Sequence, residues 1–185
     1  MITVKNIIQE GHPLLRTVAT EVSDPISLED VQLMRDMLQY VINSQDEKLA
    51  KKYNLKSGVG LAAVQIGVNK RIVAVHTEDE KGETHSYVLA NPRIVSHSEQ
   101  LTYLPDGEGC LSVSRHVRGI VPRYRRMTVQ GLDIDGNTIT VRAKDYIAII
   151  FQHEVDHLNG IMFFDHINQE SPCAPIPGAH EVRFD

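Results

Sequence analysis

The stretch QHEVDHLNG at residues 152–160 constrains this chain more than any other feature of the sequence. His153 and His157 are four positions apart, so on a helix they lie one turn apart on the same face, with Glu154 beside them. Such a pair can hold a metal ion, but a catalytic zinc-type site needs three protein ligands and an open position. The fold must therefore bring a third ligand to this helix from elsewhere.

We expect this helix to run from about Asp145 to Asn159, with Gly160 as its C-terminal cap. The 3.6-residue period puts Tyr146, Ile149, Ile150, His153 and His157 on one face. A second apolar face carries Ile147, Phe151, Val155 and Leu158. One face is expected to pack into the core and the other to border a metal and an apolar pocket.

The remaining elements predict an α+β class with mainly antiparallel sheet, packed around this C-terminal helix. A helix is expected from Ser27, with apolar residues recurring at Val31, Met34, Leu38 and Val41. Strands are expected in RIVAVH, in SYVLANPRIV, and in RMTVQGLDI and TITVRA, which form a hairpin. DEKLAKKYNLK, residues 46–56, reads as a polar bridge.

The length of 185 residues, with 42% hydrophobic residues, suits one domain over 1–185. The proline-rich stretch 167–185 is either a loosely packed tail or an extended strand on the surface.

Composition limits the expected partners and location. A net charge of −5 gives no reason to expect nucleic acid or an anionic membrane as a partner. No apolar window approaches the roughly 20 residues of a membrane span, and no signal peptide is recognisable. The cysteines Cys110 and Cys173 do not indicate a disulfide scaffold. These features together favour a cytoplasmic location.

Two regions of the sequence could supply the third ligand. Downstream, Gly160 fits the long zinc-protease motif, but the expected histidine position holds Phe163. A zincin with a more distant glutamate stays open. Upstream, Cys110 in PDGEGCLSV lies beside glycines that allow close backbone approach, and a metal would deprotonate its thiol. Cys173 lies among prolines and is expected to be an ordinary residue.

Three separated motifs then coincide with one family. GVGLAAVQIG at 58–67, EGCLSV at 108–113 and HEVDH at 153–157 resemble, in order, the signature motifs of peptide deformylases. The resemblance runs from GHPLLR to FFDHI, and the chain is similar to the second type of the family, common in Gram-positive bacteria. His12 stands where the family often has an acidic residue, and the tail after Ile167 has no counterpart, which leaves ribosome docking open.

The resemblance implies an enzyme that removes the formyl group from N-formylmethionyl nascent peptides and releases formate. It implies one divalent metal ion on Cys110, His153 and His157, with Fe²⁺ in the cell and Zn²⁺, Ni²⁺ or Co²⁺ as substitutes in vitro. Glu154 is then the base that takes the proton of the attacking water. Gln65, through its side-chain amide, and Leu111, through its backbone N–H, are the expected oxyanion donors.

Substrate-binding residues are expected around the same helix face. Val59, Tyr146, Ile149 and Ile150 are candidates for the methionine pocket, and Gly60 would let an extended peptide approach the backbone. Arg118 is a candidate for contact with peptide carbonyls. Around the ligands, Glu108, Arg123 and Asp156 are candidate orienting charges, with an arginine–carboxylate pair favoured by geometry.

The sequence is compatible with three rival interpretations. A zincin-like metallopeptidase is separated from a deformylase by whether Cys110 is a metal ligand. A structural zinc module is less favoured, because a closed site needs no carboxylate beside its ligands. A catalytically inactive relative that binds peptides would share the motifs.

Overall fold

The computed structural model describes residues 1–184. Its α-helices are α1 (Leu28–Gln45), α2 (Glu47–Tyr53) and α3 (Asp145–Leu158). The short 3₁₀ helices are η1 (Val4–Asn6), η2 (Pro13–Arg16), η3 (Ala63–Ile66) and η4 (Phe163–His166). The strands are β1 (Gly60–Ala62), β2 (Ile72–Glu78), β3 (Thr84–His97), β4 (Leu101–Tyr103), β5 (Arg123–Tyr124), β6 (Arg126–Leu132), β7 (Thr138–Lys144) and β8 (His180–Glu181). The expected α+β class with mainly antiparallel sheet is confirmed.

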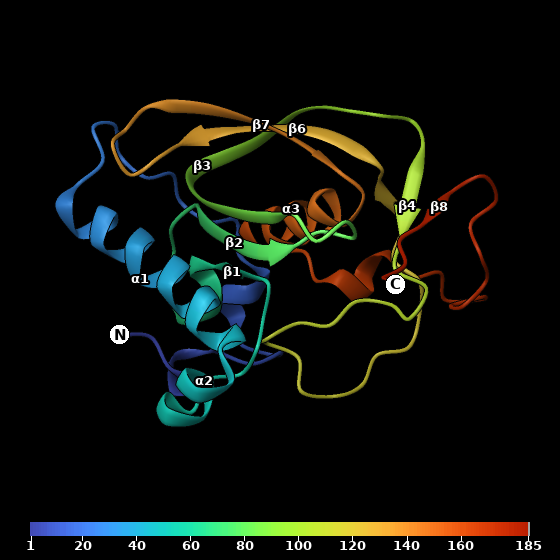
Figure 1. The fold of residues 1–185 in the computed structure, drawn as a ribbon, viewed down its shortest axis with the longest axis horizontal. Helices are drawn as coiled ribbons and strands as arrows, with labels where there is room; N and C mark the ends of the chain where they lie inside the picture. The colour runs from blue at the N-terminus through green and yellow to red at the C-terminus, as the bar shows by residue number, and fades with distance from the viewer. Residues whose placement is uncertain (185) are drawn as a thin grey trace.

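The larger of the two sheets that residues 1–184 form is antiparallel and has five strands in the order β1-β2-β3-β6-β7. In Figure 1, β3, β6 and β7 arch over α3, which lies in the hollow of the curved sheet. Strand β2 is buried on both faces: Val73 and Val75 pack with the α3 side of the core, and Ile72 and Ala74 with the α1 side. Burial on both faces explains why this segment reads as a continuous apolar run.

Helix α1 begins where the sequence predicts. Ser27 is its N-cap, and the Ser27 hydroxyl accepts from the Asp30 backbone N–H at 3.1 Å. The buried stripe differs from the expected one, because Met37 and Tyr40 are buried whereas Leu38 is only half-buried. The difference arises because α1 packs across the sheet over a wide stripe, and the sequence alone does not show where that stripe is centred.

The prediction of a polar bridge at residues 46–56 is wrong for most of its length, because α2 lies there. The Asp46 side chain caps this helix by accepting from the Leu49 N–H at 2.9 Å. None of the seven residues of α2 is buried, so the apolar periodicity that reveals most helices is missing.

The predicted hairpin and final helix are present. Strands β6 and β7 pair from Arg126↔Lys144 to Leu132↔Thr138, and Gly136 takes a φ of +79° in the turn. Helix α3 ends at Leu158, and Gly160 takes a left-handed φ of +72° just beyond it. The chain thus leaves α3 immediately after the histidine pair.

Within the C-terminal stretch, His180–Glu181 form a short extended strand, β8, and the other described residues are turns and irregular structure. β8 pairs in parallel with β4, and β5 pairs with the other edge of β4. Figure 1 shows β4 and β8 side by side, away from α1.

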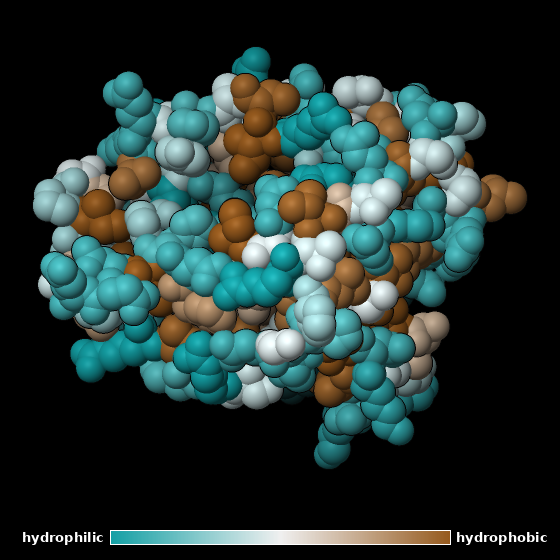
Figure 2. Space-filling view, turned by 180° about the vertical axis from the view of Figure 1, so that it is seen from behind, coloured by the Kyte–Doolittle hydropathy of each residue, from teal (hydrophilic) through white to brown (hydrophobic). Residues whose placement is uncertain are grey.

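The surface is mostly hydrophilic on the face drawn in Figure 2, where hydrophobic residues occur in groups set among hydrophilic ones. The largest fully buried side chains, Phe151, Leu15 and Met34 among them, lie inside instead. No helix within residues 1–184 has the length and apolar character needed to cross a membrane.

Candidate metal centre

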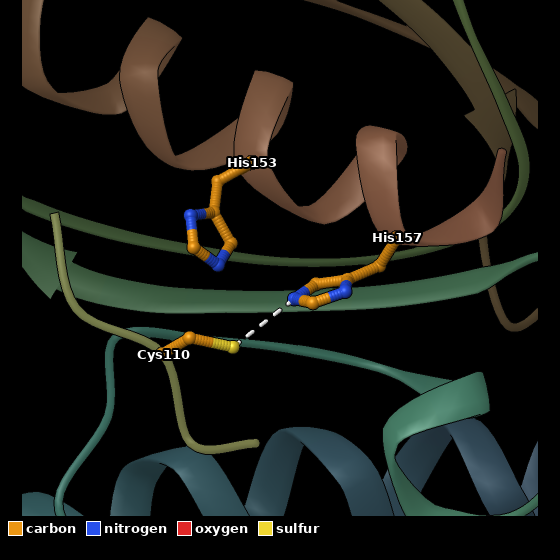
Figure 3. Close-up of side chains that lie close together, drawn as sticks. All are labelled: Cys110, His153 and His157. Atoms are coloured by element: carbon orange, nitrogen blue, oxygen red, sulfur yellow. Dashed lines mark hydrogen bonds between the residues drawn. The ribbon is translucent and has the colours of Figure 1, made fainter. Parts of the chain in front are cut away.

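Helix α3 places the two histidines of the motif on one buried face. Only 9% of His153 and 1% of His157 is exposed, and their ring centroids are 5.0 Å apart. Cys110 joins them from the loop that follows β4, and its Sγ lies 3.3 Å from Nε2 of His157. Figure 3 shows the thiol and both rings turned toward a common point. Ligand atoms from the three residues all lie within 4.8 Å of one another.

The loop carrying Cys110 is held in shape by its own backbone. The N–H of Val113 donates to the Cys110 carbonyl at 3.2 Å, and the N–H of Ser112 approaches the Cys110 sulfur at 3.4 Å. Gly107 has a φ of +81°, and a side chain there would meet the carbonyl oxygen of Gly119. Gly107, which precedes Glu108, therefore allows the two loop segments that contain Gly107 and Gly119 to pass close to each other.

A buried charge network orients His153. Its Nδ1 lies 2.8 Å from Glu108 Oε2, and Glu108 accepts two hydrogen bonds from Arg123 at 2.8 and 2.9 Å. Arg123 also donates to Asp156 at 2.5 Å. Burial raises the pKa of the Glu108 carboxyl, but Arg123 and His153 more than offset this and lower the pKa to about 2. Glu108 therefore stays ionised and fixes the His153 ring with Nε2 toward Cys110.

Glu154 lies in the same site, but unlike Glu108 it has no arginine bonded to its carboxylate among the described residues. It is 4% exposed, and its Oε2 has no hydrogen-bond partner in the described residues. Burial is the main reason why the pKa of this carboxyl rises to about 7. Gly60 lies directly against it, so that a Cβ at position 60 would collide with the carboxylate. An unpartnered buried carboxylate is costly and marks a site that another group completes.

Gln65 is held rigidly beside the sulfur. It is buried, and its Oε1 accepts from the Ala62 N–H at 2.9 Å, which directs the amide nitrogen the other way. That nitrogen lies 3.2 Å from the Ser112 hydroxyl and 3.4 Å from Cys110 Sγ. The orientation of the amide follows from this bonding, so Gln65 presents a donor to the site.

A cavity of about 440 Å³ opens beside the cluster. It brings together nearly all the residues expected at the site: Val59, Gly60, Gln65, Cys110, Leu111, Tyr146, Ile149, Ile150, His153 and Glu154. Arg118 is placed elsewhere, beside the tail residues Ser171 to Ala174, and it is not among the described residues that line this cavity. Cys173 is exposed, as expected for a residue without a role in the site.

Some lining residues were not anticipated from the sequence, Lys56 and Leu104 among them. Lys56 contacts the loop through its ammonium group, which lies 3.3 Å from the Cys110 carbonyl and 3.4 Å from that of Leu111. Leu104 lines the cavity immediately after β4. Neither lies in a motif, and no local pattern could have singled them out.

The donor set fits a divalent metal ion. One thiol and two imidazoles that converge within 4.8 Å match the nitrogen and sulfur ligands that zinc or ferrous iron accepts. Three such ligands would leave one position of a tetrahedral site for water, and the Glu154 carboxylate, whose Oε2 has no partner among the described residues, lines the same cavity. An α+β fold with such a site is of the class of metal-dependent hydrolases.

Comparisons with known proteins identify the family. The model of the family described as polypeptide deformylase matches residues 4–172. A peptide deformylase 2 of Bacillus cereus is 55% identical over 94% of this chain and 95% of its own length. A peptide deformylase of Listeria monocytogenes is 56% identical over 93% of this chain and 94% of its own length.

Solved structures agree with this result. A class I type b peptide deformylase of Acinetobacter baumannii has a TM-score of 0.72 at 30% identity, covering 90% of this chain and all of that chain. Another structure of the Acinetobacter enzyme is bound to Met-Ala-Ser and has a TM-score of 0.69 at 30% identity, covering 87% of this chain and 96% of that one. The chain belongs to the polypeptide deformylase family, the metal-dependent hydrolases that remove the formyl group from the N-terminus of newly made peptides.

Proposed function

We propose that Cys110, His153 and His157 hold the divalent metal of this deformylase and that Glu154 is its general base. The observation that carries this proposal is the buried, unpartnered Glu154 carboxylate beside three converging ligand atoms. When bound there, a metal ion supplies Lewis acidity, which polarises the formyl carbonyl and makes water easier to deprotonate.

Glu154 moves the proton in this scheme. Its carboxylate takes a proton from the water that attacks the formyl carbon. It then gives this proton to the leaving nitrogen of methionine as the C–N bond breaks and formate departs. Burial raises the pKa of this carboxyl to about 7, which suits a group that accepts a proton and then returns it near neutral pH.

Gln65 and Leu111 stabilise the negative charge that develops on the formyl oxygen. The Gln65 amide nitrogen is oriented by the bond between its Oε1 and the Ala62 N–H. The Leu111 backbone N–H follows Cys110 directly, so the loop that supplies the thiol also supplies the second donor. Donors held in place before the reaction cost no reorganisation during it.

The cavity beside the cluster binds the methionine side chain of the substrate. Val59, Tyr146, Ile149 and Ile150 form its apolar wall, and its volume of about 440 Å³ suits one side chain and part of the peptide that follows. The Met-Ala-Ser complex of the Acinetobacter enzyme supports a peptide with methionine at the first position. Gly60 keeps the approach to Glu154 open, because any larger residue there would occupy it.

We further infer Fe²⁺ as the metal in the cell, with Zn²⁺, Ni²⁺ or Co²⁺ able to replace it in vitro. A thiolate and two imidazoles accept all of these ions, so the availability of each ion in the cell decides which one is bound. The substrates are nascent peptides, which favours the cytoplasm as the location and the ribosome as a neighbour. We propose one catalytic domain over residues 1–185.

A formate-release assay tests this function. The protein is purified without oxygen, its metal content is measured, and formyl-Met-Ala-Ser is supplied as substrate. We expect about one metal ion per chain and formate release that stops after chelation and returns on adding Fe²⁺ or Ni²⁺. Cleavage of an internal peptide bond without formate release would instead support the zincin. That rival is less well supported, because Cys110 lies in the ligand cluster and Phe163 stacks on His153, with ring centroids 5.8 Å apart.

A further inference from the structure

The C-terminal stretch follows a defined course along the molecule. The Ile120 N–H donates to the Pro172 carbonyl at 2.8 Å, which fixes the start of this stretch. The chain then returns to β4, where β8 pairs with it in the register Thr102↔His180 and Tyr103↔Glu181. The two strands lie side by side in Figure 1.

Side chains lock this pairing in place. The Thr102 hydroxyl donates to the His180 carbonyl at 2.9 Å, and the Tyr103 hydroxyl donates to Glu181 at 2.6 Å. Just past β8, the Val182 N–H donates to the Tyr103 carbonyl at 3.0 Å, and Val182 is only 2% exposed. The segment therefore holds β4 by backbone bonds, side-chain bonds and burial together.

The same segment reaches two walls of the substrate cavity. Leu104, which lines the cavity, follows directly after the clamped Tyr103. Tyr146, on the first turn of α3, lines the cavity from another side. Phe184 packs edge-to-face on Tyr146, with ring centroids 4.8 Å apart and an interplanar angle of 83°. Phe184 is itself 52% exposed, so this contact is not explained by core packing.

We propose that residues 180–184 form a strap that shapes the methionine pocket, with Phe184 as a positioning residue that holds the Tyr146 ring. This inference rests on the proposed role of the cavity in binding the methionine side chain. Edge-to-face pairing restricts the rotation of Tyr146, so the pocket keeps the width that a long, unbranched apolar side chain fills. Among the described residues, the strap holds Thr102, Tyr103 and Tyr146 rather than Cys110 or Glu154, so it acts on binding and selectivity rather than on bond cleavage.

Variants at one position and a truncation test the strap. Phe184→Ala removes the ring and Phe184→Tyr restores it. The matched control Leu28→Ala removes an exposed apolar side chain on α1, outside the strap. A chain ending at Pro177 lacks the strap entirely. Each metal-loaded protein is assayed with formyl-Met-Ala-Ser and formyl-Ala-Ala-Ser, and its affinity for the product Met-Ala-Ser is measured by calorimetry.

We expect Phe184→Ala to raise KM for the methionyl substrate and to weaken Met-Ala-Ser binding by about 3- to 10-fold, within the range of an aromatic edge-to-face pair. Its kcat and metal content should stay within about twofold, and its preference for methionine over alanine should fall. Phe184→Tyr and Leu28→Ala should behave like the unchanged protein, and the truncated chain should show a larger effect than Phe184→Ala.

Two results would overturn the strap: unchanged KM and product affinity in both Phe184→Ala and the truncated chain, or loss of metal and kcat together, which indicates a structural role only. Failure of the proposed function is separately visible. If the unchanged protein binds Met-Ala-Ser but releases no formate, the function is wrong while the binding data still test the strap. If it does not bind Met-Ala-Ser, the strap proposal also fails.

Discussion

Nδ1 of His153 lies 2.8 Å from Glu108 Oε2, although the two residues are 45 positions apart in the chain. The contact leaves Nε2 of the same ring free to face Cys110, so one carboxylate decides which imidazole nitrogen the site uses. Arg123 binds the other side of this carboxylate with two hydrogen bonds, at 2.8 and 2.9 Å. The orientation of one proposed metal ligand therefore depends on a buried ion pair.

Removing the charge of Glu108 should weaken both the fold and the metal site. Glu108→Gln leaves Arg123 with Asp156 as its only carboxylate partner among the described residues. We expect unfolding to become easier by about 3 kcal/mol, at the low end for a broken buried pair, and metal affinity to fall about 10- to 100-fold. Chemical unfolding and chelator competition measure these effects. Glu10→Gln, in an exposed pair with Arg115, is the control and should change neither. Unchanged metal affinity in Glu108→Gln would show that the carboxylate does not orient His153.

The two cysteines should differ completely in metal binding. Cys110→Ala should lose tightly bound metal, because its thiol lies 3.3 Å from His157 Nε2, whereas Cys173→Ala should keep it, because that residue is exposed in the tail. Metal analysis of the two purified variants is the measurement. One firmly bound metal ion in Cys110→Ala would exclude Cys110 as a ligand and favour the zincin again.

Glu154→Gln should separate catalysis from metal binding. The amide keeps the size of the side chain but cannot accept the proton of water, so turnover should fall by roughly 10² to 10⁴-fold. Metal content and affinity for Met-Ala-Ser should remain, since the ligands and the apolar wall of the cavity are untouched. Near-normal turnover with metal bound would show that another group is the base. Loss of metal would reveal a structural role for Glu154.

Gln65 should matter for turnover more than for substrate affinity. Gln65→Leu removes the oriented amide, and the loss of one oxyanion donor lowers kcat by about 10² to 10³-fold. Ser112→Ala is the matched control, since it removes a bonding partner of the same amide, 3.2 Å away, but leaves the donor in place. Steady-state kinetics with formyl-Met-Ala-Ser tell the two variants apart. Equal losses in both would mean that the Gln65–Ser112 bond, rather than the donor, is what catalysis needs.

Oxygen should inactivate the iron form faster than the nickel form. Ferrous iron next to the Cys110 thiolate can be oxidised, and the sulfur can be oxidised with it. Activity of the two forms is followed in aerated and in oxygen-free buffer. Similar half-lives in air would contradict this expectation, and loss of the iron form without oxygen would point to simple metal release.

The local sequence determines each part of the site that lies within one element. Ser27 caps α1, Gly136 turns the β6–β7 hairpin, and His153 and His157 share a face of α3 because helical geometry alone puts residues four apart together. The order of the three motifs was sufficient to identify the family. These features depend on spacing and on backbone conformation, which a sequence displays directly.

Features that depend on packing between distant parts of the chain are visible only in the tertiary structure. Helix α2 has no buried face and so left no apolar signal, and the pairing of β8 with β4 joins segments about 78 positions apart, according to the spacing of Thr102 and His180. Arg118 was expected at the substrate but lies beside the tail, because side-chain type does not reveal which cavity a loop residue faces. The contact between Phe184 and Tyr146 could not be predicted either, because it forms only when the C-terminal segment packs against α3.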